Sequence, residues 1–199
     1  MVVITISGLH GTGKTTQAKF LAKRFGLRYV SAGEIMRKMA EERGISLEEF
    51  SRIAENDPLI DRQIDERMIS EAEKGNVVLD GRLTAWMAGD KADIKILLTA
   101  PLDIRVERIA KREGKSIEEA LKETVIREES EKKRFMDIYG IDVDDCSVFD
   151  IVVNTALWDE KSVGKLLELL VEAYSASSSK RNEASEATRM MDRGEMEVK

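Results

Sequence analysis

The chain has 199 residues, of which 42% are hydrophobic and 35% charged, with a net charge of −6 at neutral pH. This length suits one medium-sized domain with a buried core. The acidic balance argues against a stable nucleic-acid partner, because such binders carry a basic surface. No apolar run approaches a membrane span, and no signal-type segment opens the chain. The single cysteine, Cys146, excludes an internal disulfide. We therefore expect a cytoplasmic monomer that does not bind membranes.

The first predicted strand, residues 2–6, leads into GLHGTGKT at residues 8–15, a complete GxxxxGK[ST] phosphate-binding loop. A helical pattern at 14–25 follows, so the loop is expected at a helix N-terminus that attracts anions. Lys14 can reach the β- and γ-phosphates of a nucleotide, and Thr15 is placed to ligate Mg²⁺. His10 stands at a variable position, and we assign it no catalytic role. The residues expected to contact the nucleotide are Gly8, Leu9, His10, Gly11, Thr12, Gly13, Lys14, Thr15 and Thr16.

The rest of the chain alternates short apolar runs with helical patterns. Further strands are predicted at 28–30, 77–79, 94–98 and 148–153, and helices at 33–43, 46–55, 59–74, 102–113, 116–138 and 159–174. Ser46 with Glu49 and Ser116 with Glu119 have the spacing of a capping box. This alternation predicts an α/β fold with a parallel sheet covered by helices on both faces. Residues 175–199 are polar, and we expect them to form a mobile tail.

Arginines provide the main indication of which phosphate chemistry the chain performs. The chain lacks an NKxD segment and a strand ending in DxxG, which argues against a GTPase. Asp80 ends the third strand, where it suits holding Mg²⁺ through water. Transfer of a phosphoryl group between two nucleotides needs several cations and no protein nucleophile, and arginine forks serve this purpose. The arginines that follow strands or share helix faces are Arg37, Arg82, Arg105, Arg108, Arg112, Arg127 and Arg134.

Several of these side chains also have a plain structural interpretation. Arg127 could pair with Glu123 or Glu131 at helical spacing, and Arg112 could lie on a solvated face. Arg82 is the stronger candidate, because it follows a strand end where α/β sheets bind ligands. The two tryptophans, Trp86 and Trp158, are interpreted as packing residues.

In combination, these segments resemble the nucleoside monophosphate kinases, most closely the archaeal type of cytidylate kinase. The resemblance spans residues 2–173 and rests on SGLHGTGKTTQAKFLA, YVSAGEIMRKMA, DPLIDRQID, GNVVLDGRLTAWMA, PLDIRVERIAKREG, REESEKKRFMDIYGID and DIVVNT. It implies a three-layer P-loop kinase fold with a five-stranded parallel sheet in the order 2-3-1-4-5. It also implies one kinase domain over 1–174, with an acceptor-binding segment at 33–74 and a lid at 108–134.

The resemblance assigns roles to matching residues. ATP would be the phosphoryl donor, bound by the phosphate-binding loop with Mg²⁺ on Thr15 and, through water, Asp80. Arg37 and Arg82 would hold the acceptor's α-phosphate. The lid arginines Arg108 and Arg112 would cover the donor. The catalytic set implied by the resemblance is Lys14, Arg112, Arg127 and Arg134.

The acceptor implied is CMP, with dCMP also accepted, but the base-reading residues do not carry over. Bacterial cytidylate kinases have a longer insert here and an Asp after the GR pair, where this chain has Leu83. Our interpretation is that Asp61, Arg62 and Asp65 form the base or ribose site. Asp61 and Asp65 are one helical turn apart, and a carboxylate can accept the cytosine amino N–H. The alternative for these carboxylates is a solvated helix face on which they pair with neighbouring arginines. For the function of the whole chain, a kinase for AMP or UMP and a kinase-like assembly factor remain open.

Overall fold

The computed structural model describes residues 1–177 of the chain. Its five strands are all parallel and lie in the order β2-β3-β1-β4-β5, which confirms the predicted topology. The chain alternates between strands and helices, so each crossover lays a helix over the sheet. The strands are β1 (Val3–Gly8), β2 (Arg28–Ser31), β3 (Val77–Asp80), β4 (Ile94–Thr99) and β5 (Ile151–Asn154).

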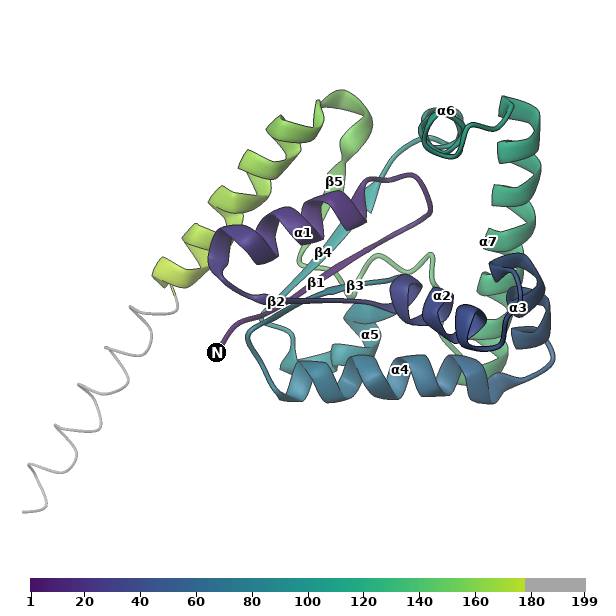
Figure 1. Cartoon of the computed structure of the whole chain (residues 1–199). Coiled ribbons are helices and arrows are strands. Elements are labelled where there is room, and N and C mark those ends of the chain that lie inside the picture. Colours follow the sequence, from purple (N-terminus) through teal and green to yellow (C-terminus); the bar gives the residue numbers. More distant parts are fainter. Residues whose placement is uncertain (178–199) are drawn as a thin grey trace, which may run out of the picture.

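The helices form the two outer layers (Figure 1). In the described part, α1 and the final helix, residues 160–177, cover one face of the sheet, where Leu21 and Leu167 are fully buried against Ile4 and Ile96. Helices α4 and α5 cover the other face. The helices are α1 (Lys14–Phe25), α2 (Ala32–Glu42), α3 (Leu47–Ala54), α4 (Pro58–Glu73), α5 (Thr84–Ala88), α6 (Leu102–Glu113) and α7 (Ile117–Tyr139), with short 3₁₀ turns η1 (Gly89–Lys91) and η2 (Thr155–Leu157).

Helices α2, α3 and α4 pack together beside the carboxyl end of β2. Phe50 is fully buried among Ala40, Ile60 and Ile64, so this unit has a small apolar core of its own. Helices α6 and α7 form a second pair beyond the sheet edge, joined by a cluster that includes Val106. Both units border the carboxyl ends of the strands, where parallel α/β folds bind ligands.

The helix starts follow the predicted capping chemistry in part. Ser116 and Glu119 form a complete capping box at the start of α7. At α3, the Ser46 hydroxyl accepts the Glu49 N–H, which is one half of that arrangement. In both cases an otherwise unpaired backbone donor at the helix start gains a partner.

Most element boundaries lie within one or two residues of the sequence prediction, and three differences are larger. Strand β5 begins at Ile151 rather than 148, because a turn in which Phe149 N–H bonds Cys146 C=O precedes it. Helix α5 was not predicted, and at five residues it is too short to show a helical period. The final helix continues to 177, three residues into the expected tail. The rest of that tail lies outside the described residues.

Candidate active site

The phosphate-binding loop joins β1 to α1 in a conformation that depends on glycine. Gly8 and Gly11 have φ of +152° and +80°, in the region that side chains rarely adopt. A Cβ at Gly11 would lie 2.5 Å from the Arg105 carbonyl oxygen, and one at Gly8 would lie 2.4 Å from that of Leu98. Thr12 Oγ1 donates to the Leu9 carbonyl at 2.8 Å. The loop is therefore held close to β4 and α6, open toward the start of α1.

Lys14 is the first residue of α1, and its side chain folds back over the loop. Its Nζ donates to the Leu9 carbonyl at 3.3 Å. Burial lowers the pKa of Lys14, while the carboxylates of Asp80 and Glu131 oppose this shift. These two carboxylates favour the charged form of the Lys14 ammonium at the point where the loop would receive phosphates.

Asp80 and Thr15 meet across the ends of β3 and α1. Thr15 Oγ1 donates to Asp80 Oδ2 at 2.7 Å, and Tyr29 and Ser31 hydroxyls donate to the same oxygen at 3.0 and 3.3 Å. Asp80 Oδ1 is buried and has no hydrogen-bond partner among the described residues. A buried carboxylate oxygen without a donor is costly, and a hydrated cation would satisfy it. The residues present therefore fit Mg²⁺.

Any such ion needs further ligands from outside the protein. Within residues 1–177, no group of three or more His, Cys, Asp or Glu side chains could hold a metal alone. Mg²⁺ in phosphoryl-transfer sites is bound by one or two protein oxygens, with water and phosphate oxygens completing the shell. The Thr15 and Asp80 pair matches this arrangement.

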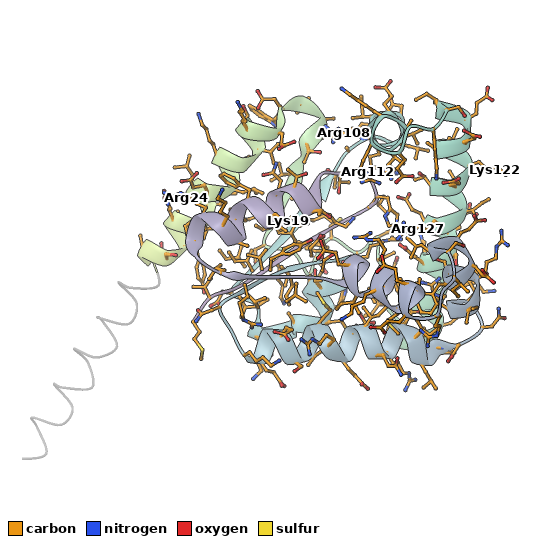
Figure 2. The ribbon with its side chains drawn as sticks, viewed as in Figure 1. Lys19, Arg24, Arg108, Arg112, Lys122 and Arg127 are labelled. Carbon is orange, nitrogen blue, oxygen red and sulfur yellow. The ribbon has the colours of Figure 1, made fainter. Side chains whose placement is uncertain are left out.

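A cavity of about 410 Å³ opens beside the loop, between the start of α1, α6 and the end of β5. Arg108 lines it, and its guanidinium donates to the Thr155 hydroxyl and carbonyl, each at 2.9 Å, and to the Gly11 carbonyl at 3.3 Å. Arg112 also lines it, but its side chain is 65% exposed and paired with Glu113. Arg108 is thus fixed against the loop while Arg112 remains on the surface. Figure 2 shows both beside α6, with Arg127 between α7 and the loop after β1.

Trp158 lines this cavity too, which corrects its interpretation as a packing residue. It follows β5 and is 53% exposed. Trp86, by contrast, packs edge-on against Phe149 with ring centroids 5.2 Å apart. A half-exposed indole at the mouth of a polar cavity can stack on a base.

Glu131 lies at the centre of the site, and the sequence prediction gave it no role beyond a pair with Arg127. Its carboxylate accepts from Arg82 Nη1 at 2.9 Å and Arg127 Nε at 3.0 Å, and lies 3.1 Å from His10 Nε2. Its side chain is only 11% exposed. Burial alone would raise the pKa of Glu131, but the cations and His10 hold that pKa well below its usual range. The ionised carboxylate therefore joins the loop, the end of β3 and α7.

This contact bears on both interpretations of Arg127. The helical pair with Glu131 exists, as the structural interpretation expected, but it is shared with Arg82 in a largely buried cluster. Arg127 Nη1 and Nη2 make no hydrogen bond with the described residues. Glu131 thus orients Arg127 and leaves the end of its guanidinium free for an anion.

Arg134 pairs instead with Asp61, on α4. Arg134 Nε donates to Asp61 Oδ2 at 2.8 Å, and the side chains are 10% and 6% exposed. Burial raises the pKa of Asp61, and Arg134 opposes the shift. The alternative interpretation anticipated a pairing with an arginine, but its solvated helix face is wrong for Asp61, because the pair is buried. Arg127 and Arg134, expected to act together, are held by different carboxylates.

Asp65 lies on the same buried face of α4, one turn after Asp61. It accepts a 2.7 Å hydrogen bond from Tyr139, and burial raises its pKa to about 6. Arg62 lies on the exposed side of the helix, so the structure separates it from the two carboxylates. Arg37, on α2, is also exposed. The base-reading role of Asp61, Arg62 and Asp65 stays a prediction.

Comparison with known proteins identifies the family to which this chain is similar. Residues 3–157 match the cytidylate kinase-like family. A cytidylate kinase of Staphylothermus marinus is 57% identical over 172 residues, which cover 86% of this chain and 96% of that protein. The cytidylate kinase of Methanocaldococcus jannaschii is 48% identical over 174 residues, covering 86% and 98%.

Solved structures agree on the fold alone. The shikimate kinase of Bacteroides thetaiotaomicron has a TM-score of 0.58 at 18% identity, over 86% of this chain and 98% of that one. The shikimate kinase of Aquifex aeolicus gives 0.54 at 15% identity, over 88% and 99%. None of the helices in residues 1–177 combines the length and apolar character that a bilayer span requires. With the family match and these relatives, the chain belongs to the cytidylate kinase-like family.

Proposed function

We propose that this chain is a cytidylate kinase that transfers the γ-phosphoryl group of ATP to CMP, and also to dCMP. The observation that carries the proposal is the convergence of the phosphate-binding loop, Arg82 and Arg127 on one buried point. Transfer between two phosphates requires cations where donor and acceptor meet. CMP as the acceptor is supported by the names of relatives that are 44–57% identical.

The donor would occupy the loop and the cavity beside it. Backbone N–H groups of the loop would hold the β-phosphate, with Lys14 reaching the γ-phosphate. Arg108 and Trp158 would border the adenine, with Arg112 moving in from the surface. A Mg²⁺ ion held by Thr15 and, through water, by Asp80 would neutralise charge across the β- and γ-phosphates.

The acceptor would lie on the other side of the loop. Arg37 and Arg82 would hold its α-phosphate, within an acceptor-binding segment at 33–74. A phosphate oxygen of CMP attacks the γ-phosphorus in line while the bond to the ADP oxygen breaks. Arg127 and Arg134, in a lid over residues 108–134, would neutralise the charge that spreads over the transferring group.

The protein contributes positioning and exclusion of water in this scheme. No protein nucleophile is needed, and the site holds arginines rather than an acid–base pair. Closure of the lid would keep water from the γ-phosphate. The kinase domain would comprise residues 1–174. A cytoplasmic location and a monomeric state stay predictions of the sequence.

A panel of acceptors tests the proposal. Steady-state ADP release would be measured with CMP, dCMP, UMP and AMP at fixed Mg·ATP. We expect CMP to give the highest kcat/KM. Faster turnover of AMP or UMP would overturn CMP as the acceptor, and tight ATP binding without any stimulation by monophosphates would favour an assembly factor instead.

A further inference from the structure

We propose that His10 is a positioning residue that couples the phosphate-binding loop to Arg82 and Arg127. This inference rests on the roles of Arg82 and Arg127 in the proposed function. The bond between His10 Nε2 and Glu131 is the link, because the same carboxylate holds both arginines. A change in the loop would thereby reach Arg82, which is proposed to bind the acceptor.

The main chain of His10 is clamped by two side chains. Its N–H donates to Glu128 Oε1 at 3.2 Å, and its carbonyl accepts from Arg105 Nη1 at 2.9 Å. Arg105 and Glu128 also pair with each other at 2.6 Å, with side chains 5% and 14% exposed. Helices α6 and α7 therefore fix the backbone at this position, which directs the imidazole toward α7.

The imidazole contacts both oxygens of Glu131 at 3.1 Å. Burial lowers the pKa of His10, although Glu131 opposes the shift. Because Glu131 is ionised and can only accept, Nε2 must carry the proton and donate it. This hydrogen bond makes His10 an anchor for the carboxylate.

The cluster offers a short route between the two halves of the site. His10 belongs to the loop, Arg82 follows β3, and Arg127 lies on α7. Glu131 contacts all three and is nearly buried, so its carboxylate has little room to move alone. When the loop tightens around phosphates, the carboxylate must follow His10 or lose that bond. Donor binding would then reorient both arginines and change the affinity for CMP. This change in affinity is a coupling free energy between the two sites.

Two substitutions separate this coupling from simple packing. His10→Ala removes the link, whereas His10→Gln places an amide N–H close to the former Nε2 and should restore part of it. Glu129→Gln is the matched control, because Glu129 is an exposed neighbour on α7 outside the cluster. The dissociation constant of CMP would be measured by calorimetry with and without Mg²⁺ and a non-hydrolysable ATP analogue.

We expect the analogue to tighten CMP binding in the wild type and in Glu129→Gln. His10→Ala should reduce this enhancement by about tenfold, with the analogue's own affinity changed much less. The enhancement in His10→Gln should lie between those of the wild type and His10→Ala. An unchanged enhancement in His10→Ala would overturn the proposal, as would a wild type without any enhancement.

A second readout does not depend on CMP. His10 is the only histidine of the chain, so its ring gives one set of NMR signals. Adding the ATP analogue should shift these signals and the Arg82 Nε–H signal of the wild type, since Arg82 is proposed to contact the acceptor and not the donor. In His10→Ala, the Arg82 response should be lost, and a persistent response would overturn the coupling. Failure of CMP to bind the wild type would instead overturn the proposed acceptor.

Discussion

The Thr15 hydroxyl donates a 2.7 Å hydrogen bond to the Asp80 carboxylate, which joins the start of α1 to the end of β3. These residues are 65 positions apart in the chain, and the parallel sheet brings them together. The other Asp80 oxygen is buried and has no hydrogen-bond partner within residues 1–177. The pair therefore fits the hydrated cation that the proposed function requires.

Replacing Asp80 with Asn should impair the use of Mg²⁺. Loss of the charge weakens the hold on the hydrated ion, so we expect a fall in kcat of about 100-fold and a higher Mg²⁺ requirement. Titration of activity with Mg²⁺ at fixed ATP measures both. Tyr29→Phe removes one donor to Asp80 and leaves the carboxylate, so it should have a much smaller effect. Equal losses in the two variants would contradict the assignment.

Arg127 and Arg37 should differ in the kinetic constant that they affect. Arg127 would act on the transferring group, so Arg127→Ala should lower kcat by about 100-fold or more with little change in ATP affinity. Arg37→Ala should mainly raise the acceptor's KM, because it would bind the acceptor in both ground and transition states. Initial-rate kinetics at varied ATP and acceptor distinguish them. Swapped results would mean that the acceptor and lid assignments are wrong.

Asp61 should be important for stability whatever its role in base recognition. Asp61→Ala leaves the Arg134 charge buried and unpaired, which should cost about 3–5 kcal/mol in the free energy of unfolding. Arg62→Ala changes an exposed neighbour and should stay within about 0.5 kcal/mol. Denaturant unfolding gives both values. At a temperature where the variant is folded, an unchanged preference for CMP over UMP would remove Asp61 from base recognition.

Asp65 should make stability depend on pH. Burial raises its pKa to about 6 in the folded state, from an ordinary value of 3.8. The folded state binds this proton more tightly, so the Asp65 contribution to stability falls as the pH rises from about 4 to 6.

Asp65→Asn keeps an acceptor for Tyr139 and has no carboxyl group to ionise. It should exceed the wild type in unfolding free energy at pH 8 by roughly 1–3 kcal/mol, with a smaller difference at pH 4.5. Chemical denaturation at the two pH values provides the comparison. The same difference at both would show that Asp65 does not titrate in this range.

Trp158 should report donor binding. If its half-exposed ring stacks on adenine, Trp158→Ala should raise the KM for ATP by about tenfold, since base stacking contributes about 1–3 kcal/mol. ATP should also quench fluorescence in Trp86→Phe, where Trp158 is the remaining tryptophan. Quenching that persists in Trp158→Ala would place the responsive ring at Trp86.

Much of the fold could be predicted because its signals are local. The GLHGTGKT loop, the β-branched strands and the helical spacing each depend on neighbouring residues, and their alternation restricts the sheet to few orders. The order 2-3-1-4-5, which the family resemblance implied, is confirmed. Helix α5 was missed because five residues carry no measurable period.

The sequence by itself determined the phosphate-binding loop, the alternation of strands and helices, and the arginine-rich character of the site, while the sheet order followed from the resemblance to the nucleoside monophosphate kinases. Only the tertiary structure decided which partners those side chains take. Both Glu123 and Glu131 are spaced to pair with Arg127 on the helix. Arg127 pairs with Glu131, which also contacts His10, 121 positions away in the chain. Likewise, Asp61 pairs with Arg134 across 73 positions. Such contacts depend on which helix faces meet across the sheet, and no local pattern encodes that.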